Sequence, residues 1–308
     1  MLDIDDAADK RRFLAAQPAF RAWQRGERNA KAFSAWTGEA MTVDFADITS
    51  KQQKVWRLGD YGRVGSLLSW IGEALVRDLD IHSDERVLDV AAGNGNAALP
   101  AARRFADVLA TDYVPELLDQ AAARARAEGV LLRTEVADAQ SLPYPDAAYD
   151  VVMSTIGAMF APDQEAVAGE LLRVCRRGGR IGMANWTPDS MVGDMFRAVG
   201  KRVPPPQGVQ PAAAWGSEQR VGELLRPGCG DLRLDRRTCS WRFPSTRACL
   251  EYFRTWYGPT VAAFAAVGDE GREGLETELV AVFDNHNTTD DGTFAAEVTY
   301  LQVLGTRA

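Results

Sequence analysis

The sequence predicts an α/β protein whose sheet is doubly wound, mostly parallel and seven-stranded. Between residues 86 and 186, five short apolar runs alternate with segments of helical periodicity. Such alternation requires parallel strands with helices on both faces of the sheet. Two later strands, expected in 231–243 and 297–307, are separated by a helical excursion and can pair antiparallel at the sheet edge. The prediction therefore includes an N-terminal helical extension and a helical cap inserted between the last two strands.

The individual elements follow from local signals. Apolar residues at helical spacing predict an amphipathic helix over about 62–79. The change to the continuous apolar run of 86–91 predicts a buried parallel strand. A helix that begins near Pro115 and is closed by Gly129 has the usual terminal residues. The other elements are expected at 95–105 (helix), 108–112, 131–138 and 149–155 (strands), 163–175 (helix), 180–186 (strand), and 217–226 and 246–286 (helices).

The N-terminal part carries a different pattern. Residues 1–48 alternate charged with aromatic positions, which predicts helices that either close over the core as a lid or extend its surface. The stretch 49–53 offers two capping-box spacings, which predict a short helix through Trp56. The Pro-rich stretch 203–211 predicts a stiff linker. The aromatic positions of the first segment are Phe13, Phe20, Trp23, Phe33, Trp36 and Phe45.

Charge and cysteine content indicate which partners and cofactors are not expected. The 308 residues carry a formal net charge of −8 and no basic stripe, so nucleic acid is not an expected partner. Four cysteines without a C-x-x-C pair, and two histidines, predict reduced, buried thiols and no metal site. The acidic N-terminus lacks an apolar signal core, and no apolar run has the length that spans a bilayer. A soluble, cytoplasmic protein without a membrane partner is expected.

The stretch DVAAGNGNAAL, residues 89–99, forms a glycine loop between a predicted strand and a helix. Its Gly93-x-Gly95-x-x-Ala98 spacing fits the fingerprint that binds nicotinamide dinucleotides. It also fits an acid-plus-glycines loop that holds S-adenosylmethionine. Asp112 lies 17 residues after Gly95 and could hold ribose hydroxyls in either case. The loop and Asp112 alone do not separate the two cofactors.

Further residues favour S-adenosylmethionine. Asp89 lies inside the strand directly before the loop, where its carboxylate would repel a pyrophosphate but attract an ammonium or sulfonium group. Asp138 and Ala139 end the third strand, where an acid can accept a hydrogen bond from an adenine amino group. The fourth strand is followed by the loop Ser154–Phe160.

Five segments resemble, in order and spacing, the class I S-adenosylmethionine-dependent methyltransferases, especially the group with the ubiquinone and menaquinone C-methyltransferases (methyltransferase type 11). The resemblance covers about residues 50–190. One departure is visible, because Ala91 stands where the D-x-G-x-G-x-G pattern has its first glycine. The segments are VLDVAAGNGN, ATDYVPELL, VADAQSLPYPD, YDVVMSTIGAMFAPD and ELLRVCRRGGRIGMANWTP.

The resemblance implies the class I methyltransferase fold, S-adenosyl-L-methionine as cofactor and a set of contacts. Asp89 and the loop backbone would hold the methionine part, Asp112 the ribose, and Asp138 with Ala139 the adenine. Tyr61, before the first helix, would bond the cofactor carboxylate, although it could equally be a core aromatic. The full implied set of cofactor residues is Tyr61, Asp89, Ala91, Gly93, Asn94, Gly95, Asp112, Tyr113, Val114, Asp138, Ala139 and Ser154.

The acceptor pocket is expected under three segments: the N-terminal helices, the loop 156–160 and the excursion 246–287. The aromatic residues of the excursion cover more than one helix face, so part of them should line an apolar pocket or, alternatively, only pack the cap. No general base stands out, and His286 is a weak catalytic candidate that could equally be a surface residue. The expected pocket residues are Trp56, Met159, Phe160, Trp256 and Tyr257.

The expected activity is methyl transfer to O, N or C of a small molecule of aromatic, quinone-like or natural-product type. Two alternatives stay open: another reaction at the same cofactor site, such as a cyclisation, or a non-catalytic binding module. The predicted division is a lid over 1–60, a cofactor-binding core over 61–200, and a part over 201–308 that completes the sheet and contains the cap 246–287. The acceptor and the oligomeric state, including a homodimer, are left open.

Overall fold

The structure is a computed structural model and describes residues 43–308. The chain divides into two compact units, residues 1–48 with 205–209, and residues 49–204 with 210–308. The predicted helices before residue 43 lie outside the described residues. Of the first unit, the structure describes the start of α3 (Phe45–Trp56) and the segment 205–209. The sheet belongs to the second unit.

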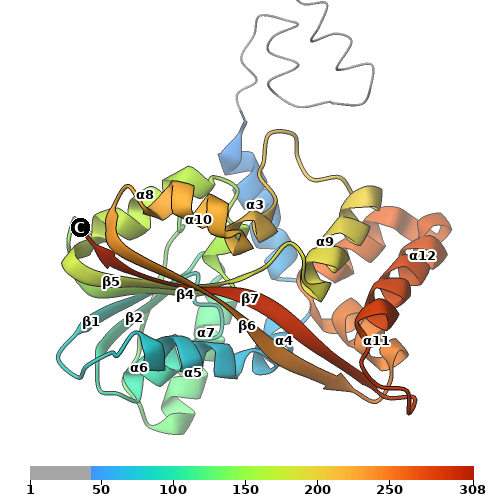
Figure 1. The fold of residues 1–308 in the computed structure, drawn as a ribbon, viewed down its shortest axis with the longest axis horizontal. Coiled ribbons are helices and arrows are strands. Elements are labelled where there is room, and N and C mark those ends of the chain that lie inside the picture. The colour runs from blue at the N-terminus through green and yellow to red at the C-terminus, as the bar shows by residue number, and fades with distance from the viewer. Residues whose placement is uncertain (1–42) are drawn as a thin grey trace, which may run out of the picture. The chain divides into compact units, whose positions relative to one another are not determined.

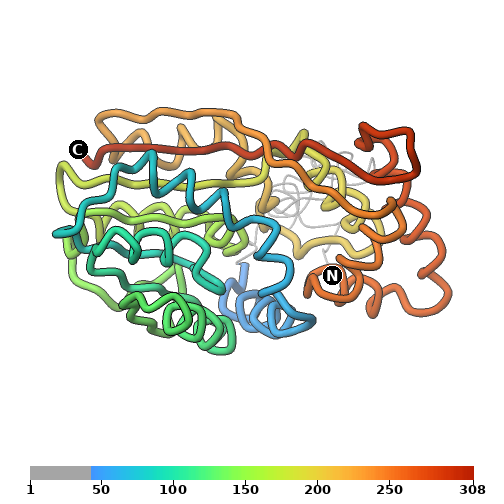
Figure 2. Tube along the Cα trace, turned by 90° about the horizontal axis from the view of Figure 1, so that it is seen from below, coloured from blue at the N-terminus to red at the C-terminus, as the bar shows by residue number. Residues whose placement is uncertain are grey.

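The second unit contains a seven-stranded sheet in the order β3-β2-β1-β4-β5-β7-β6, which confirms the predicted fold class (Figure 1). The first five strands are parallel, and β7 pairs antiparallel with both β5 and β6. Figure 2 shows β6 and β7 running side by side past the parallel strands toward the cap. The strands are β1 (Arg86–Val90), β2 (Asp107–Asp112), β3 (Arg133–Val136), β4 (Tyr149–Thr155), β5 (Cys175–Trp186), β6 (Cys229–Phe243) and β7 (Phe294–Arg307).

Helices cover both faces of this sheet, with α5 and α6 on one side and α8 and α10 on the other (Figure 1). Successive residues of a strand face opposite sides, so Val151 and Met153 pack in one core cluster and Val152 in the other. The helices are α4 (Tyr61–Ser66), α5 (Ser69–Asp78), α6 (Ala98–Ala102), α7 (Pro115–Glu128), α8 (Gln164–Val174), α9 (Met191–Arg202), α10 (Glu218–Leu225), α11 (Thr246–Trp256) and α12 (Gly258–His286).

Some boundaries differ from the prediction. The helix expected over 62–79 is broken into α4 and α5. At the break, the carbonyl of Gly65 accepts from the backbone N–H of Leu68 and from Asn96 Nδ2, at 2.9 and 2.8 Å, and so is used by a tighter turn. The strand expected from residue 180 already begins at Cys175. Helix α9 was not predicted at all.

Two expectations, one about the cysteines and one about membrane-spanning segments, can be compared with residues 43–308. All four cysteines are buried and unpaired, as predicted. None of the described helices combines the length and the apolar character that crossing a membrane requires.

A short segment before α4 lies directly against the junction of α11 and α12. The backbone N–H of Asp60 donates to the Trp256 carbonyl at 3.0 Å, and Gly59 forms a β-bridge with Tyr257. A Cβ at Gly59 would lie 2.4 Å from the Trp256 oxygen, so only glycine allows this approach. We call residues 57–60 the strap, and its contacts with the junction bring Trp56 and Tyr61 next to the cap.

Candidate active site

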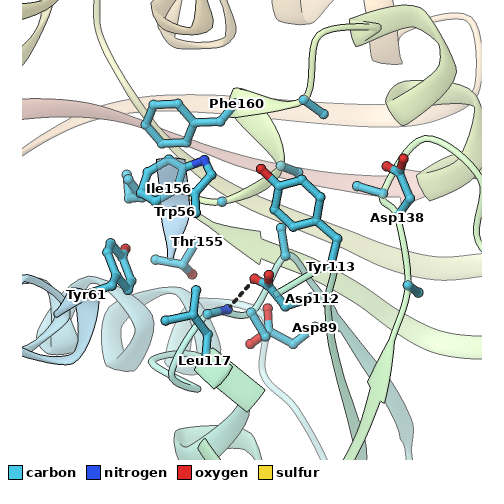
Figure 3. A pocket seen from close by; sticks show the side chains of 18 of the residues that line it. Trp56, Tyr61, Asp89, Asp112, Tyr113, Leu117, Asp138, Thr155, Ile156 and Phe160 are labelled. Atoms are coloured by element: carbon cyan, nitrogen blue, oxygen red, sulfur yellow. Dashed lines mark hydrogen bonds between the residues drawn. The ribbon is translucent and has the colours of Figure 1, made fainter. Parts of the chain in front are cut away.

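A cavity of about 760 Å³ lies at the carboxyl ends of β1, β2 and β4 (Figure 3). Ligands of open α/β sheets bind at this edge. Ten of the predicted site residues line it: Trp56, Tyr61, Asp89, Ala91, Gly93, Asp112, Tyr113, Asp138, Ala139 and Phe160.

Asp89 is the most unusual group of this cavity. It is 1% exposed, and within residues 43–308 neither carboxylate oxygen meets the geometric criteria for a hydrogen bond. Burial raises the pKa of Asp89 to about 8, and a weak interaction with the backbone N–H of Ala98 offsets only part of that rise. A buried carboxyl without a partner is costly unless a cation pairs with it. The group is therefore placed to receive a positively charged ligand atom.

Asp112 organises the glycine loop. Its Oδ2 accepts from the backbone N–H of Gly93 and its Oδ1 from that of Val114, both at 2.9 Å. Burial raises the pKa of Asp112 to about 6, and these backbone donors counteract it. A carboxylate has further lone pairs, so it can still accept from ligand hydroxyls. Val114 thus supports Asp112 and does not itself line the cavity.

The glycines of the loop adopt left-handed backbone conformations, with φ of +55° at Gly93 and +86° at Gly95. Gly95 and Asn94 do not line the cavity. Behind the loop, Arg124 donates to the Asn94 carbonyl at 2.7 Å and to Asn96 Oδ1 at 2.9 Å. Asn94 and Arg124 therefore fix the loop from outside.

A polar network closes the far end of the cavity around Asp138. The Gln140 amide donates to both Asp138 oxygens at 3.1 Å and to the Thr49 hydroxyl at 2.9 Å. Its carbonyl oxygen accepts from the backbone N–H of Asp163 at 2.9 Å. Gln140 was not predicted as a site residue, although it lies two positions after Asp138 in the same motif. The network orients the Asp138 carboxylate at the cavity wall.

The end of β4 places a different side chain in the cavity from the one expected. Ser154 Oγ accepts from the backbone N–H of Ala158 at 3.0 Å and does not line the cavity. The next residue, Thr155, does line it, and its buried hydroxyl has no hydrogen-bond partner in the described part of the chain. Ile156 follows with φ +54°, a strained conformation for a branched residue. The loop after β4 thus presents Thr155 and Ile156 to the cavity.

Ala91, at the position of the missing glycine, has φ +53°. Gly157 lies directly against it, since a Cβ at Gly157 would be 2.1 Å from the Ala91 carbonyl oxygen. Holding alanine in the left-handed region costs about 1–2 kcal/mol relative to glycine. Glycine loses more conformational entropy on folding, which would cancel part of this difference. The loop therefore holds backbone strain at Ala91.

In Ala91→Gly we expect the free energy of unfolding to rise by up to about 1 kcal/mol, because the strain disappears. Urea denaturation of the two proteins measures the difference. Ala92→Gly is the matched control, since Ala92 is not in the left-handed region and should lose stability. Equal stabilities of the two variants would contradict the strain at Ala91.

A second, smaller cavity of about 310 Å³ adjoins the first. Trp56, Tyr61, Ile156 and Phe160 belong to the walls of both. The ring of Trp56 makes edge-to-face contacts with Tyr61, Phe160 and Tyr257, at centroid distances of 5.7, 4.9 and 5.7 Å. We call the smaller cavity the chamber; it is lined by Trp56, Tyr61, Val64, Leu68, Ile156, Phe160, Trp186, Val192, Met195, Trp241, Phe253 and Tyr257.

Of the remaining predicted residues, one lines the chamber and the others line neither cavity. Tyr257 lines the chamber, but Trp256 lies under the Arg63 guanidinium, 4.3 Å from its ring centroid, and lines neither cavity. Met159 is fully buried outside both walls. His286 Nε2 lies 2.7 Å from Asp194 Oδ2, on helices α12 and α9, and also lines neither cavity. The structure does not bring Met159, Trp256 or His286 to the site.

Sequence reasoning missed the contribution of α9 to the chamber. Val192 and Met195 come from this helix, whose Ser190 accepts from the Gly193 backbone N–H as an N-cap. The signal was present, because a serine precedes apolar residues at helical spacing. Trp186 and Trp241, from β5 and β6, could be placed only by the fold.

Comparison with known proteins agrees with this geometry. Residues 87–179 match the family model described as a methyltransferase domain. The chain is 42% identical over 235 residues to the uncharacterized protein Rv1403c of Mycobacterium tuberculosis, covering 75% of this chain and 84% of that protein. It is 36% identical over 172 residues to a demethylmenaquinone methyltransferase of Deinococcus radiodurans, covering 54% and 70%.

A solved structure shows the same fold. The YcgJ protein of Bacillus subtilis superposes with a TM-score of 0.54 at 19% identity, over 77% of this chain and 97% of that one. This chain belongs to the class I S-adenosylmethionine-dependent methyltransferases.

Proposed function

We propose that this chain binds S-adenosylmethionine in the larger cavity and transfers its methyl group to a small molecule in the chamber. The observation that carries the proposal is the buried, unpartnered Asp89 carboxyl beside a glycine loop. An ammonium group there would supply the missing partner. A dinucleotide would instead bring pyrophosphate charge toward three acidic residues of the same wall, Asp89, Asp112 and Asp138.

In this proposal Asp89 and the loop backbone around Gly93 hold the methionine part. Asp112 holds the ribose, while Asp138, positioned by Gln140, accepts from the adenine amino group. Thr155 replaces Ser154 as the polar group near the sulfonium, since its hydroxyl lines the cavity. Tyr61 lies where it can contact both ligands.

When bound, S-adenosylmethionine supplies an activated methyl group, which forms a bond to the acceptor as the methyl–sulfur bond breaks and its electron pair stays on sulfur. The four residues shared by both walls align the two compartments and keep water from the meeting point. Among the described residues that line the chamber, Tyr61 and Tyr257 are the titratable ones. Burial raises the pKa of both, so they stay neutral and act as donors.

The remaining expectations belong to the same proposal. The enzyme is cytoplasmic, acts without nucleic acid, and uses residues 61–200 as its cofactor-binding core, completed by 201–308 with the cap 246–287. The predicted lid or extension over residues 1–60 lies largely outside the described residues, since the structure describes it only from residue 43. The acidic charge of the chain supports the absence of a nucleic acid partner.

Isothermal titration calorimetry tests the proposal. We expect S-adenosylhomocysteine to bind and NAD to produce no heat of binding. Full turnover should yield one S-adenosylhomocysteine for each methylated product, which separates methyl transfer from a cyclisation at the same site. Tight NAD binding without any response to S-adenosylhomocysteine would overturn the assignment.

A further inference from the structure

The chamber has a distinctive chemistry, because none of the lining side chains from residues 43–308 carries a charge. Its wall consists of aromatic rings, aliphatic chains and one thioether. Transferring a carboxylate or an ammonium into such surroundings without a partner costs far more than transferring a neutral group. The chamber therefore excludes charged acceptors.

Two phenols are the main polar groups of the wall. The rings of Tyr61 and Tyr257 both pack against the Trp56 ring at centroid distances of 5.7 Å, and no hydrogen bond to either hydroxyl is found within residues 43–308. Tyr61 belongs to both cavities, so this pair lies at the boundary where the methyl group would meet the acceptor. Neutral phenols donate to an oxygen atom and can also accept from a hydroxyl.

A third polar group points to an oxygen-bearing ligand as well. Trp241 is 3% exposed and lines the chamber, and among the described residues its indole N–H has no partner apart from a weak interaction with the Cys239 thiol. A buried donor without a partner is rare and costs free energy unless a ligand or water satisfies it. The rings of Trp56, Trp241 and Phe253 meanwhile offer flat surfaces for stacking.

We propose that the acceptor is an uncharged, ring-bearing hydroxy compound, a phenol or an enol, and that the Tyr61 and Tyr257 hydroxyls select it by binding its oxygen. This inference rests on the proposed function, because it assigns the chamber to the acceptor. The two tyrosines are specificity-determining residues. The described wall of the chamber contains no carboxylate or imidazole. The acceptor therefore enters as the neutral hydroxy compound, and as its oxygen bonds to the methyl group its hydroxyl proton passes to solvent.

Three matched probes test the class of acceptor: biphenyl-4-ol, biphenyl-4-carboxylate and 4-biphenylmethylammonium. Binding to the full chain is followed by quenching of tryptophan fluorescence, since Trp56, Trp186 and Trp241 line the chamber. We expect biphenyl-4-ol to bind at least about tenfold more tightly than either charged probe. Equal or tighter binding of a charged probe would overturn the inference.

Substitutions then test the role of the hydroxyls. Tyr257→Phe should raise the dissociation constant for biphenyl-4-ol about threefold to tenfold and leave that for unsubstituted biphenyl within about twofold. Tyr144→Phe is the matched control, because its hydroxyl bonds Glu135 at 2.9 Å away from both cavities. An equal loss for biphenyl-4-ol and biphenyl in Tyr257→Phe would contradict selection by the hydroxyl.

A bulky substitution that fills the chamber tests whether the probes bind there. Val192→Trp should abolish binding of both biphenyl-4-ol and biphenyl, and undiminished binding would place the probes elsewhere and overturn the inference. If Val192→Trp loses the wild-type thermal transition, Tyr257→Phe, which removes a single oxygen, decides alone. Wild-type binding of S-adenosylhomocysteine is measured in parallel. Its failure would refute the proposed function, whereas intact cofactor binding with no preference among the probes would refute only this inference.

Discussion

In Asp89→Asn, the dissociation constant for S-adenosylhomocysteine is expected to rise by about a hundredfold or more. The side chain is buried and has no protein partner, so in the complex its negative charge would be the main counterion of the ligand ammonium. Removing one member of a buried charge pair costs about 2–5 kcal/mol, because the other charge is left unpaired. Calorimetry or equilibrium dialysis measures the change directly.

Asp194→Asn is the control for this substitution. Its carboxylate pairs with His286 and Arg197 on α12 and α9 and lines neither cavity. Cofactor affinity in Asp194→Asn should match the wild type. An unchanged dissociation constant in Asp89→Asn would show that the ammonium lies elsewhere and would remove the central support of the proposed function.

The stability of the ligand-free protein should fall as the pH rises from about 4 to 8. The folded state holds a proton on Asp89 up to its raised pKa of about 8, whereas the unfolded chain releases it near the ordinary value of an aspartate. The folded protein thus binds more protons than the unfolded chain across this window. For each such proton, the free energy of unfolding decreases by up to about 1.4 kcal/mol per pH unit. Asp112, with a pKa of about 6, adds to the slope in its lower half.

Urea denaturation at pH 5, 6, 7 and 8 measures this slope in the wild type and in Asp89→Asn. Asparagine has no proton to release, so the variant should show the shallower dependence and exceed the wild type most at pH 8. Binding of a cation by Asp89 reverses the sign for the complex. Cofactor affinity should therefore increase with pH up to about 8. Parallel stability curves for the two proteins would mean that Asp89 is ionised in the folded state.

The parts of the site that the sequence predicted are those encoded locally. Asp89, Gly93 and Asp112 lie at ends of strands in a repeating pattern, and parallel strands bring their carboxyl ends to one edge. The prediction of Ser154 instead of Thr155 shows the limit of this reasoning. Successive strand residues face opposite ways, so an error of one position selects the wrong side chain.

The chamber shows a second limit. Its walls come from α4, α9, β5, β6 and the start of the cap, which are separated by up to two hundred residues and meet only in the folded protein. The aromatic residues of the excursion cover more than one helix face, and this pattern indicated an apolar pocket near Tyr257. It could not show that Trp256, one residue earlier, turns toward Arg63.

Under the proposed function, the strap has a consequence for how ligands enter and leave. Residues 57–60 are bonded to the cap junction through main-chain groups, and they connect Trp56 to Tyr61, which belong to both walls. A displacement of the strap would therefore open both compartments at once. Departure of the spent cofactor and exchange of the acceptor would then be coupled, because neither compartment could open while the other stayed closed.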